Sequence, residues 1–355
     1  LQFSVGALPE IQEVEPNNEF DKPQKINLNT TVNGVIENED VDYFLVEAKK
    51  GQRIVAEIEG LRLGETTFDP YLAILDTRRF VRAEADDTPL VLQDSVCSIV
   101  APQDGNYIIQ VRESAFGGSS QCRYRLHVGT FPRPLAVYPA GGILGQTGEV
   151  RWLGDVGGEW TEKVALPPAP QPMFGLFART EQGIAPSSNP FRLGQLPNVM
   201  EVEPNNTPAQ ATQFQAPAAL NGVIGQPGDV DCFKFAAKAG QVYDVRVHAR
   251  SIRSALDSVL TIGRLNGPVL ASNDDSGTPD SYLRFQAPAD DQYVISVSDH
   301  LNQGKPHYVY RVEVTPVQPR LTLGLVERQQ FVDVTMPVPR GNRLAAMVSA
   351  QREDF

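Results

Sequence analysis

The residues of this chain that could do chemistry are acids and amides grouped in one short motif. The hexapeptide Glu-Val-Glu-Pro-Asn-Asn stands at residues 13–18 and returns unchanged at residues 201–206. A residue before proline favours extended backbone, and an extended chain places alternate side chains on one side. Glu13, Glu15 and Asn17 are therefore expected to face the same way. Two carboxylates and an amide oxygen are ligands that a hard cation such as Ca²⁺ prefers, so the pattern indicates a calcium site.

A second acidic group follows the hexapeptide. Asp40 and Asp42 lie at the start of a predicted strand and share one side of it. Carboxylates brought close together repel each other unless a cation or solvent lies between them. An alternative interpretation stays open, in which Asn17 and Asn18 form a turn and the acids face water. The Asp-Asp pairs at 86–87 and 274–275 are more typical of turns than of ligands.

Motifs for catalysis are absent from the sequence. None of the four histidines lies in an H-E-x-x-H motif or in a close pair with metal spacing. There is no G-x-S-x-G nucleophile elbow, no phosphate-binding loop and no dinucleotide fingerprint. We therefore predict that this chain is not an enzyme, although a catalytic domain elsewhere in a longer protein is compatible with it.

The three cysteines do not form a disulfide framework. Cys97 and Cys122 alternate with apolar neighbours and are expected to point inward, either as two buried thiols or as a disulfide. Cys232 stands where the first half of the chain has Tyr43, and we interpret it as a small core residue.

The flanks of the hexapeptide recur as well, which indicates a duplicated domain. Asn-Gly-Val-Ile stands at 33–36 and 221–224, and Asp-Val-Asp stands at 40–42 and 229–231. The spacing between matching motifs drifts by one or two residues, as it does when loops change length and strands do not.

Composition limits the possible partners. The chain has 355 residues, 41% of them apolar, and a net charge of −12. That length suits two or three domains, and the charge argues against a nucleic-acid or anionic-membrane partner. No run of 18 apolar residues is present to span a membrane. Because the first residues form neither a signal peptide nor a methionine start, we expect a fragment of a longer protein.

Short period-2 runs bounded by turn residues dominate the chain, and no segment shows helical periodicity. This pattern predicts an all-β protein with antiparallel β-sandwiches. The stretch 131–198 is rich in proline and glycine but contains Trp152, Trp160 and paired apolar runs, so we expect a small immunoglobulin-like β module there. The predicted divisions are 1–11 (the end of a truncated β module), 12–130 (the first sandwich), 131–198 (the spacer), 199–316 (the second sandwich) and 317–355 (the start of a further truncated module).

The ordered motifs E-x-E-P-N-N, N-G-x-I, D-x-D-[YC]-F and Y-R-[LV] resemble those of the bacterial pre-peptidase C-terminal domain, which is similar to the collagen-binding domains of secreted collagenases. The resemblance covers about two thirds of the chain. It implies jelly-roll-like sandwiches that are themselves not catalytic, in an exported protein. It also implies Ca²⁺ ligands at the matching positions, which are Glu13, Glu15, Asn17, Asn18, Asn33 and Asp40 in the first repeat and Glu201, Glu203, Asn205, Asn206, Asn221 and Asp229 in the second.

Three functions are compatible with this resemblance. The first is a non-catalytic module for stability, display or adhesion in an exported (secreted, periplasmic or cell-surface) protein. The second is an auxiliary region of a secreted peptidase, and the third is a lectin-like sandwich that binds an extracellular protein or polysaccharide. Collagen binding is not expected, because the strands that begin at Tyr107 and Tyr293 carry no further aromatic residue. The spacer resembles the immunoglobulin-like IPT/TIG modules of bacterial surface proteins.

Overall fold

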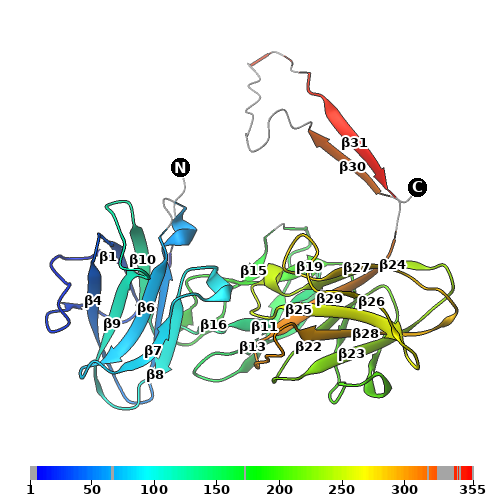
Figure 1. Ribbon diagram of the computed structural model, residues 1–355. Helices are drawn as coiled ribbons and strands as arrows, with labels where there is room; N and C mark the ends of the chain where they lie inside the picture. The colour runs from blue at the N-terminus through cyan, green and yellow to red at the C-terminus, as the bar shows by residue number, and fades with distance from the viewer. Residues whose placement is uncertain are drawn as a thin grey trace.

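The protein is built almost entirely of β-strands (Figure 1). The computed structural model describes residues 6–64, 68–171, 173–317, 320–325, 340–341, 343 and 345–353. Parts of the two predicted terminal modules, among them residues 1–5 and 326–339, lie outside the described residues. The helices of the described part are short 3-10 turns, η1 (Leu61–Leu63), η2 (Pro89–Val91), η3 (Pro208–Gln210) and η4 (Arg250–Ile252). The prediction of an all-β protein built of paired sheets is confirmed.

The first sandwich consists of two five-stranded sheets. One sheet has the order β1-β3-β10-β5-β8, formed by Glu10–Gln12, Thr30–Val35, Arg123–Gly129, Arg53–Glu59 and Val96–Val100. The other has the order β2-β4-β9-β6-β7, formed by Gln24–Lys25, Val41–Ala48, Gly105–Glu113, Pro70–Asp76 and Val81–Ala85. The short strands β1 and β2 run parallel to their neighbours, and the other pairs are antiparallel.

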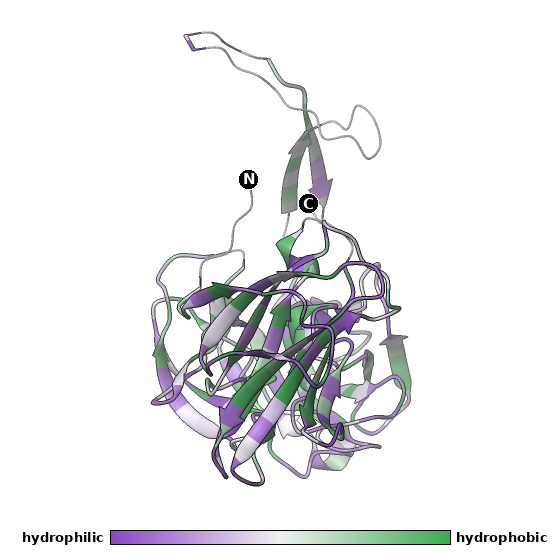
Figure 2. Ribbon diagram, turned by 90° about the vertical axis from the view of Figure 1, so that its left-hand side faces the viewer, coloured by the Kyte–Doolittle hydropathy of each residue, from purple (hydrophilic) through white to green (hydrophobic). Residues whose placement is uncertain are grey.

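Alternation along the strands forms the core between the sheets. In β4, Phe44 and Val46 are fully buried, while Tyr43 and Leu45, which alternate with them, lie on the outer face. The core also takes in Tyr107, together with residues of every long strand. Figure 2 shows the same alternation of hydrophobic and hydrophilic residues along the strands of the molecule.

The second sandwich repeats the first strand for strand. Its sheets have the orders β20-β22-β29-β24-β27 and β21-β23-β28-β25-β26. The first is formed by Asn198–Met200, Ala218–Val223, Val309–Pro316, Val242–His248 and Tyr282–Gln286, and the second by Thr212–Gln213, Val230–Ala237, Asp291–Asp299, Ser258–Arg264 and Val269–Asn273. Cys232 lies in β23 and is buried, although it packs outside the main core, beside Ala211 and Val294.

Between the sandwiches lies a smaller β module, which we call the middle module. A three-stranded sheet contains β11 (Ala136–Tyr138), β13 (Thr147–Leu153) and β14 (Trp160–Ala165). Three two-stranded pairs complete the module: β12 (Gly141–Ile143) with β19 (Arg192–Gly194), β15 (Gly175–Leu176) with β18 (Asn189–Pro190), and β16 (Arg179–Thr180) with β17 (Gly183–Ile184). Its own core includes Trp152, stacked on Trp160 with ring centroids 5.7 Å apart. A last hairpin, β30 (Arg320–Leu325) and β31 (Val348–Glu353), stands away from the body in Figure 1.

The middle module contacts both sandwiches through ion pairs, which are buried on the first sandwich and partly exposed on the second. On the first sandwich, Arg53 pairs with Asp155 at 2.6 Å and Glu57 pairs with Arg133 at 2.5 Å. On the second, Arg192 pairs with Glu313 at 3.0 Å. These ion pairs attach both sandwiches to the middle module.

Cys97 and Cys122 are both buried and both free thiols, so the disulfide considered from the sequence is wrong. The register explains why. Cys97 in β8 lies opposite Ala56, which lies opposite Val128 in β10. Six residues of strand, roughly 20 Å, separate Val128 from Cys122. A disulfide needs Cα atoms within about 7 Å.

Candidate metal centre

The first site begins where β1 ends. The Glu13 amide donates to the carbonyl of Asn33 at 3.0 Å, which extends the pairing of β1 with β3 by one residue. The Glu13 side chain then turns back to the same strand, and its Oε1 accepts the Val35 N–H at 2.7 Å. Its Oε2 lies 2.9 Å from the hydroxyl of Tyr124, whose one proton it shares with Asp42 Oδ2. Glu13 is thus held on both oxygens, at the rim of the sandwich.

Glu15 and Asn17 form the next part of the site. Glu15 is exposed, and its Oε2 accepts the Asn17 N–H at 2.9 Å. The Asn17 carbonyl accepts the Tyr43 N–H at 3.1 Å, which ties the loop to β4. The Asn17 side chain is only 1% exposed, and neither of its amide atoms has a hydrogen-bond partner. A buried amide left without partners is costly, so a ligand at this position would relieve the cost.

Asp42 completes the cluster from the opposite sheet. One oxygen each from Glu13, Glu15 and Asp42 lie within 4.8 Å of one another. Asp42 is fully buried; its Oδ2 accepts the Tyr124 hydroxyl, and its Oδ1 has no partner. Among the described residues, no lysine or arginine forms an ion pair with these three carboxylates.

The second sandwich has the same cluster in Glu201, Glu203 and Asp231, again with oxygens within 4.8 Å of one another. The supporting contacts also recur. Glu201 accepts the Val223 N–H at 3.0 Å, Glu203 accepts the Asn205 N–H at 2.9 Å, and Asp231 accepts the Tyr310 hydroxyl at 2.7 Å.

Unpaired buried atoms recur in the second cluster too. The Asn205 amide has no partner on either atom, and Glu201 Oε2 and Asp231 Oδ1 have none. Two loops of identical sequence therefore leave the asparagine amide and one aspartate oxygen without a partner in both domains, and the second domain leaves Glu201 Oε2 unpartnered as well.

Not all of the predicted ligands lie in the cluster. Asn18 donates to Asp40, and Asp40 also accepts the Glu37 N–H at 3.3 Å, so these two side chains bind each other beside the cluster. The side chain of Asn33 donates to Glu10 at 3.1 Å, so it contacts that acid in place of the cluster.

In the second sandwich the Asn–Asp contact recurs, but the other asparagine has a different partner. Asn206 donates to Asp229 at 3.1 Å, and both residues line an open basin together with Glu201 and Glu203. Asn221 is fully buried and donates to the Ala219 carbonyl at 3.0 Å.

Burial and mutual repulsion make the ionised form of both clusters unfavourable. Burial first raises the pKa of Asp42, and the charges of Glu13, Asp40 and Glu15 raise it further. Burial likewise raises the pKa of Asp231, as do the charges of Asp229 and Glu203. A cation at the cluster would reverse these effects, because it lowers the cost of the charged form.

The donor set at each cluster consists of oxygen only. Glu13, Glu15 and Asp42 offer carboxylates, and Asn17 offers an unpartnered buried amide. Ca²⁺ takes six to eight oxygen ligands, whereas zinc and copper sites usually include histidine nitrogen or cysteine sulfur. The residues present therefore fit a calcium ion, with water free to complete the coordination on the exposed side of Glu15.

Sequence reasoning grouped Asp42 with Asp40 but placed Asp40 in the ligand set, and it missed two supporting residues, Tyr124 as the donor to Asp42, and Gly34. A Cβ added at Gly34 would come within 2.3 Å of both Glu13 Oε2 and the Tyr124 ring, so only glycine allows these groups to meet. All of these residues lie in motifs that recur in the second half of the chain, where Gly222 has the same restriction. The recurrence of these motifs was the available signal, but it does not reveal which side chains meet at the end of the sandwich where the cluster lies.

Comparison with known proteins agrees with the duplication. A family model described as the bacterial pre-peptidase C-terminal domain matches residues 40–113 and 229–299. A probable subtilase-type serine protease of Deinococcus radiodurans is 41% identical over 99 residues, which cover 27% of this chain and 14% of the relative. The aligned region is therefore a small part of that relative's length.

Solved structures were found as well. The pre-peptidase C-terminal domain of a Bacillus anthracis collagenase is 14% identical, with a TM-score of 0.26. The match covers 32% of this chain and 100% of the collagenase domain. A periplasmic inhibitor of g-type lysozyme from Aeromonas hydrophila is 17% identical, with a TM-score of 0.21. That match covers 30% of this chain and 97% of the inhibitor. None of the helices in the described residues has the length and apolar character needed to cross a bilayer.

Proposed function

We propose that this chain, which carries two bacterial pre-peptidase C-terminal domains, is a non-catalytic module of an exported protein and that each domain binds one Ca²⁺. One observation carries the calcium proposal. In each domain three carboxylates bring one oxygen each within 4.8 Å of one another, and the asparagine of the same loop keeps a buried amide without a partner. No basic residue is paired to these carboxylates in the described part of the chain.

The ion would be held by Glu13, Glu15, Asp42 and Asn17 in the first domain, and by Glu201, Glu203, Asp231 and Asn205 in the second. Asp40 and Asp229 lie close enough to add to the negative potential. Since these groups come together only in the folded chain, the ion binds the folded state and stabilises it by RT ln(1 + [L]/Kd). That amounts to about 2.7 kcal/mol at a hundredfold excess over Kd.

Isothermal titration calorimetry with CaCl₂ on the chelator-treated chain tests this directly. We expect two ions per chain, one after Glu13→Gln with Glu15→Gln, and one after Glu201→Gln with Glu203→Gln. Thermal melting should shift upward with millimolar Ca²⁺ and return with chelator, and combining all four substitutions should abolish the shift.

Glu19→Gln is the matched control. Glu19 lies just after the first hexapeptide, where it forms an exposed ion pair with Lys22, and it takes no part in the cluster. This variant should keep both ions. No binding heat, together with identical melting curves in calcium and in chelator, would contradict the proposal and favour solvated acids.

We propose that this chain is an accessory region of a larger exported protein. Pre-peptidase C-terminal domains are typical of secreted peptidases, and the Deinococcus relative is a probable protease. An accessory role in an exported protein, for stability, display or attachment of a peptidase, accords with both.

We also propose finer assignments for the fold. The strand order β3-β10-β5-β8 facing β4-β9-β6-β7 supports a jelly roll, and the separate core of the middle module supports an immunoglobulin-like spacer.

A second candidate function, binding of an extracellular protein or polysaccharide, is favoured by the outer face of the first sandwich. There Phe20 packs edge-on against Tyr43, and Arg112 lies 3.9 Å from the centroid of the Tyr71 ring. Arginine and aromatic residues are enriched at binding surfaces. The second sandwich has Cys232 in place of Tyr43. Loss of binding to a matrix extract after Tyr71→Ala, with the melting temperature unchanged, would support this function.

A further inference from the structure

In the second cluster, a residue of the middle module contacts the backbone carbonyl that binds the start of the acidic loop. The hydroxyl of Tyr138, at the end of β11, donates to the carbonyl of Asn221 at 3.2 Å. The same carbonyl accepts the N–H of Glu201 at 3.0 Å. The middle module and the start of the acidic loop therefore share one acceptor.

Tyr138 also touches the strand that holds the Glu201 carboxylate. Its ring packs in an apolar cluster that includes Val223, and the Val223 N–H donates to Glu201 Oε1 at 3.0 Å. Burial, followed by the charges of Glu201 and Asp231, raises the pKa of the Tyr138 hydroxyl above its usual value. The hydroxyl thus lies within the electrostatic reach of the cluster.

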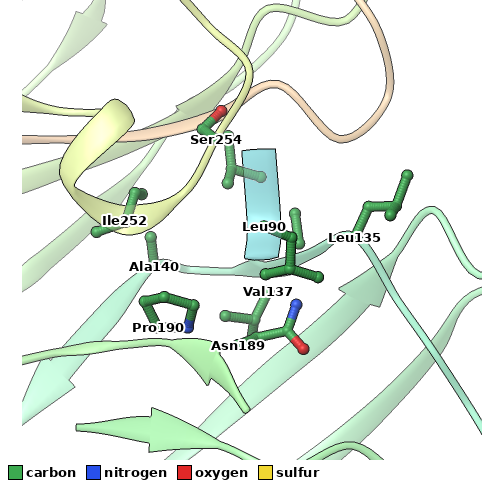
Figure 3. Close-up of a pocket in the computed structure, with 10 residues that line it drawn as sticks. Leu90, Leu135, Val137, Ala140, Asn189, Pro190, Ile252 and Ser254 are labelled. Atoms are coloured by element: carbon green, nitrogen blue, oxygen red, sulfur yellow. The ribbon is translucent and has the colours of Figure 1, made fainter. Parts of the chain in front are cut away.

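Packing fixes the position of Tyr138. Its neighbours Val137 and Ala140 line a small cavity where all three units meet, with Leu90 from the first sandwich and Ile252 from the second (Figure 3). Beside this cavity Tyr138 packs against a buried apolar cluster that joins Ala140 of the middle module to Ile252 of the second sandwich, and close packing of this kind leaves little freedom to the backbone that carries it. The hydroxyl therefore reaches Asn221 only while the middle module is docked on the second sandwich.

The first cluster provides an internal comparison. The carbonyl of Asn33, the counterpart of Asn221, accepts the Glu13 N–H at 3.0 Å. Within the described residues, no hydroxyl from another module donates to it. The two sites have the same carboxylates, and they differ in this contact with a neighbouring module.

We propose that Tyr138 couples the second calcium site to the docking of the middle module, so that cation binding there and closure of that interface stabilise each other. The first site is independent of the interface. This inference rests on the proposed calcium function. The coupling must act in both directions, because a ligand that favours one arrangement is itself bound more tightly by that arrangement.

The test measures calcium affinity by titration calorimetry in two backgrounds. With Glu13→Gln and Glu15→Gln, only the second site remains, and we expect Tyr138→Phe to weaken its affinity about 3- to 10-fold, the loss of roughly one hydrogen bond. With Glu201→Gln and Glu203→Gln, only the first site remains, and Tyr138→Phe should leave its affinity unchanged.

Hydrogen exchange measured by mass spectrometry tests the reverse direction without any substitution at Tyr138, so it stands even if Tyr138→Phe fails to fold. Calcium should increase the protection of peptides covering residues 136–143 of the middle module. The increase should persist with Glu13→Gln and Glu15→Gln, and disappear with Glu201→Gln and Glu203→Gln.

The outcomes separate the two proposals. If the unsubstituted chain binds calcium at neither site, the proposed function fails and this inference falls with it. If both sites bind calcium, but Tyr138→Phe leaves the second affinity unchanged and residues 136–143 gain no protection, only the coupling is overturned.

Discussion

The hydroxyl of Tyr124 donates to the carboxylate of Asp42 across the two sheets of the first sandwich. Tyr124 belongs to β10 and Asp42 to β4, so this hydrogen bond joins the sheets at the rim where the acidic loop crosses. Tyr310 and Asp231 repeat the contact in the second sandwich at 2.7 Å. The tyrosine neutralises no charge, but it satisfies one oxygen of an aspartate that is otherwise buried among other acids.

Removing this donor should destabilise the calcium-free protein. Tyr124→Phe leaves Asp42 with both oxygens unpartnered in a buried position, which costs about 1–3 kcal/mol of unfolding free energy. Urea unfolding in chelator measures the loss. Added calcium should recover part of it, because the cation then offsets the charge of the same carboxylate.

Tyr107→Phe is the matched control for this prediction. Tyr107 is a buried tyrosine of the same core, and its hydroxyl donates to the Gln103 carbonyl at 3.0 Å, away from the acids. Its substitution should cost less, and calcium should recover none of that cost. An equal response of both variants to calcium would contradict the role given to Tyr124.

Gly34 should not tolerate a methyl group. In Gly34→Ala the new Cβ would lie within 2.3 Å of Glu13 Oε2 and the Tyr124 ring, so the site must open to accept it. Overpacking of this kind costs about 1–3 kcal/mol, and calcium binding by the first site should weaken with it. Melting curves with and without calcium measure both effects. Gly148→Ala is the control, since its Cβ would meet nothing within 4 Å.

The sequence predicted the duplicated all-β architecture because recurring motifs and period-2 patterns are local properties. The acidic loop was predictable for the same reason, since Glu13 and Glu15 are neighbours in the chain. The sequence did not predict which aspartate joins Glu13 and Glu15 in the cluster. Asp40 and Asp42 share one side of a strand in an ideal pattern, yet Asp40 lies where the chain enters β4 and is bound by Asn18.

Contacts between distant segments of the chain could not be predicted from the sequence either. The cysteine separation depends on the register of three strands, and the Tyr138 contact depends on how two modules pack. Apolar patterning does not encode either quantity, because a strand can slide by two residues without changing which face is buried.

Chemical labelling should find three free thiols. Alkylation in denaturant without reductant is expected to add three labels to the intact mass, since Cys97, Cys122 and Cys232 are all free. Under native conditions labelling should be slow, because the thiols are buried and burial raises the pKa of Cys97. Finding one label in denaturant, rising to three after reduction, would reveal a disulfide and contradict the register.

Acid should loosen the interface between the first sandwich and the middle module. Burial alone would raise the pKa of Glu57, but the charges of Arg133 and Arg62 more than offset it, and the pKa lies below its usual range. A carboxyl whose pKa is lowered by folding contributes its full stability above the ordinary glutamate pKa of about 4.3. That contribution is lost as the pH falls through the lowered value.

The variant Glu57→Gln isolates this contribution. At pH 7 it leaves the buried guanidinium of Arg133 without its counter-charge, which should cost about 3 kcal/mol. The difference from the unsubstituted chain, measured by urea unfolding, should shrink as the pH falls below 4, because Glu57 takes up a proton in the unfolded chain before it does so in the folded one. Glu47→Gln removes an exposed pair with Lys25 and should change little at any pH. A difference for Glu57→Gln that stays constant from pH 7 to pH 3 would show that the charge of Glu57 does not hold this interface.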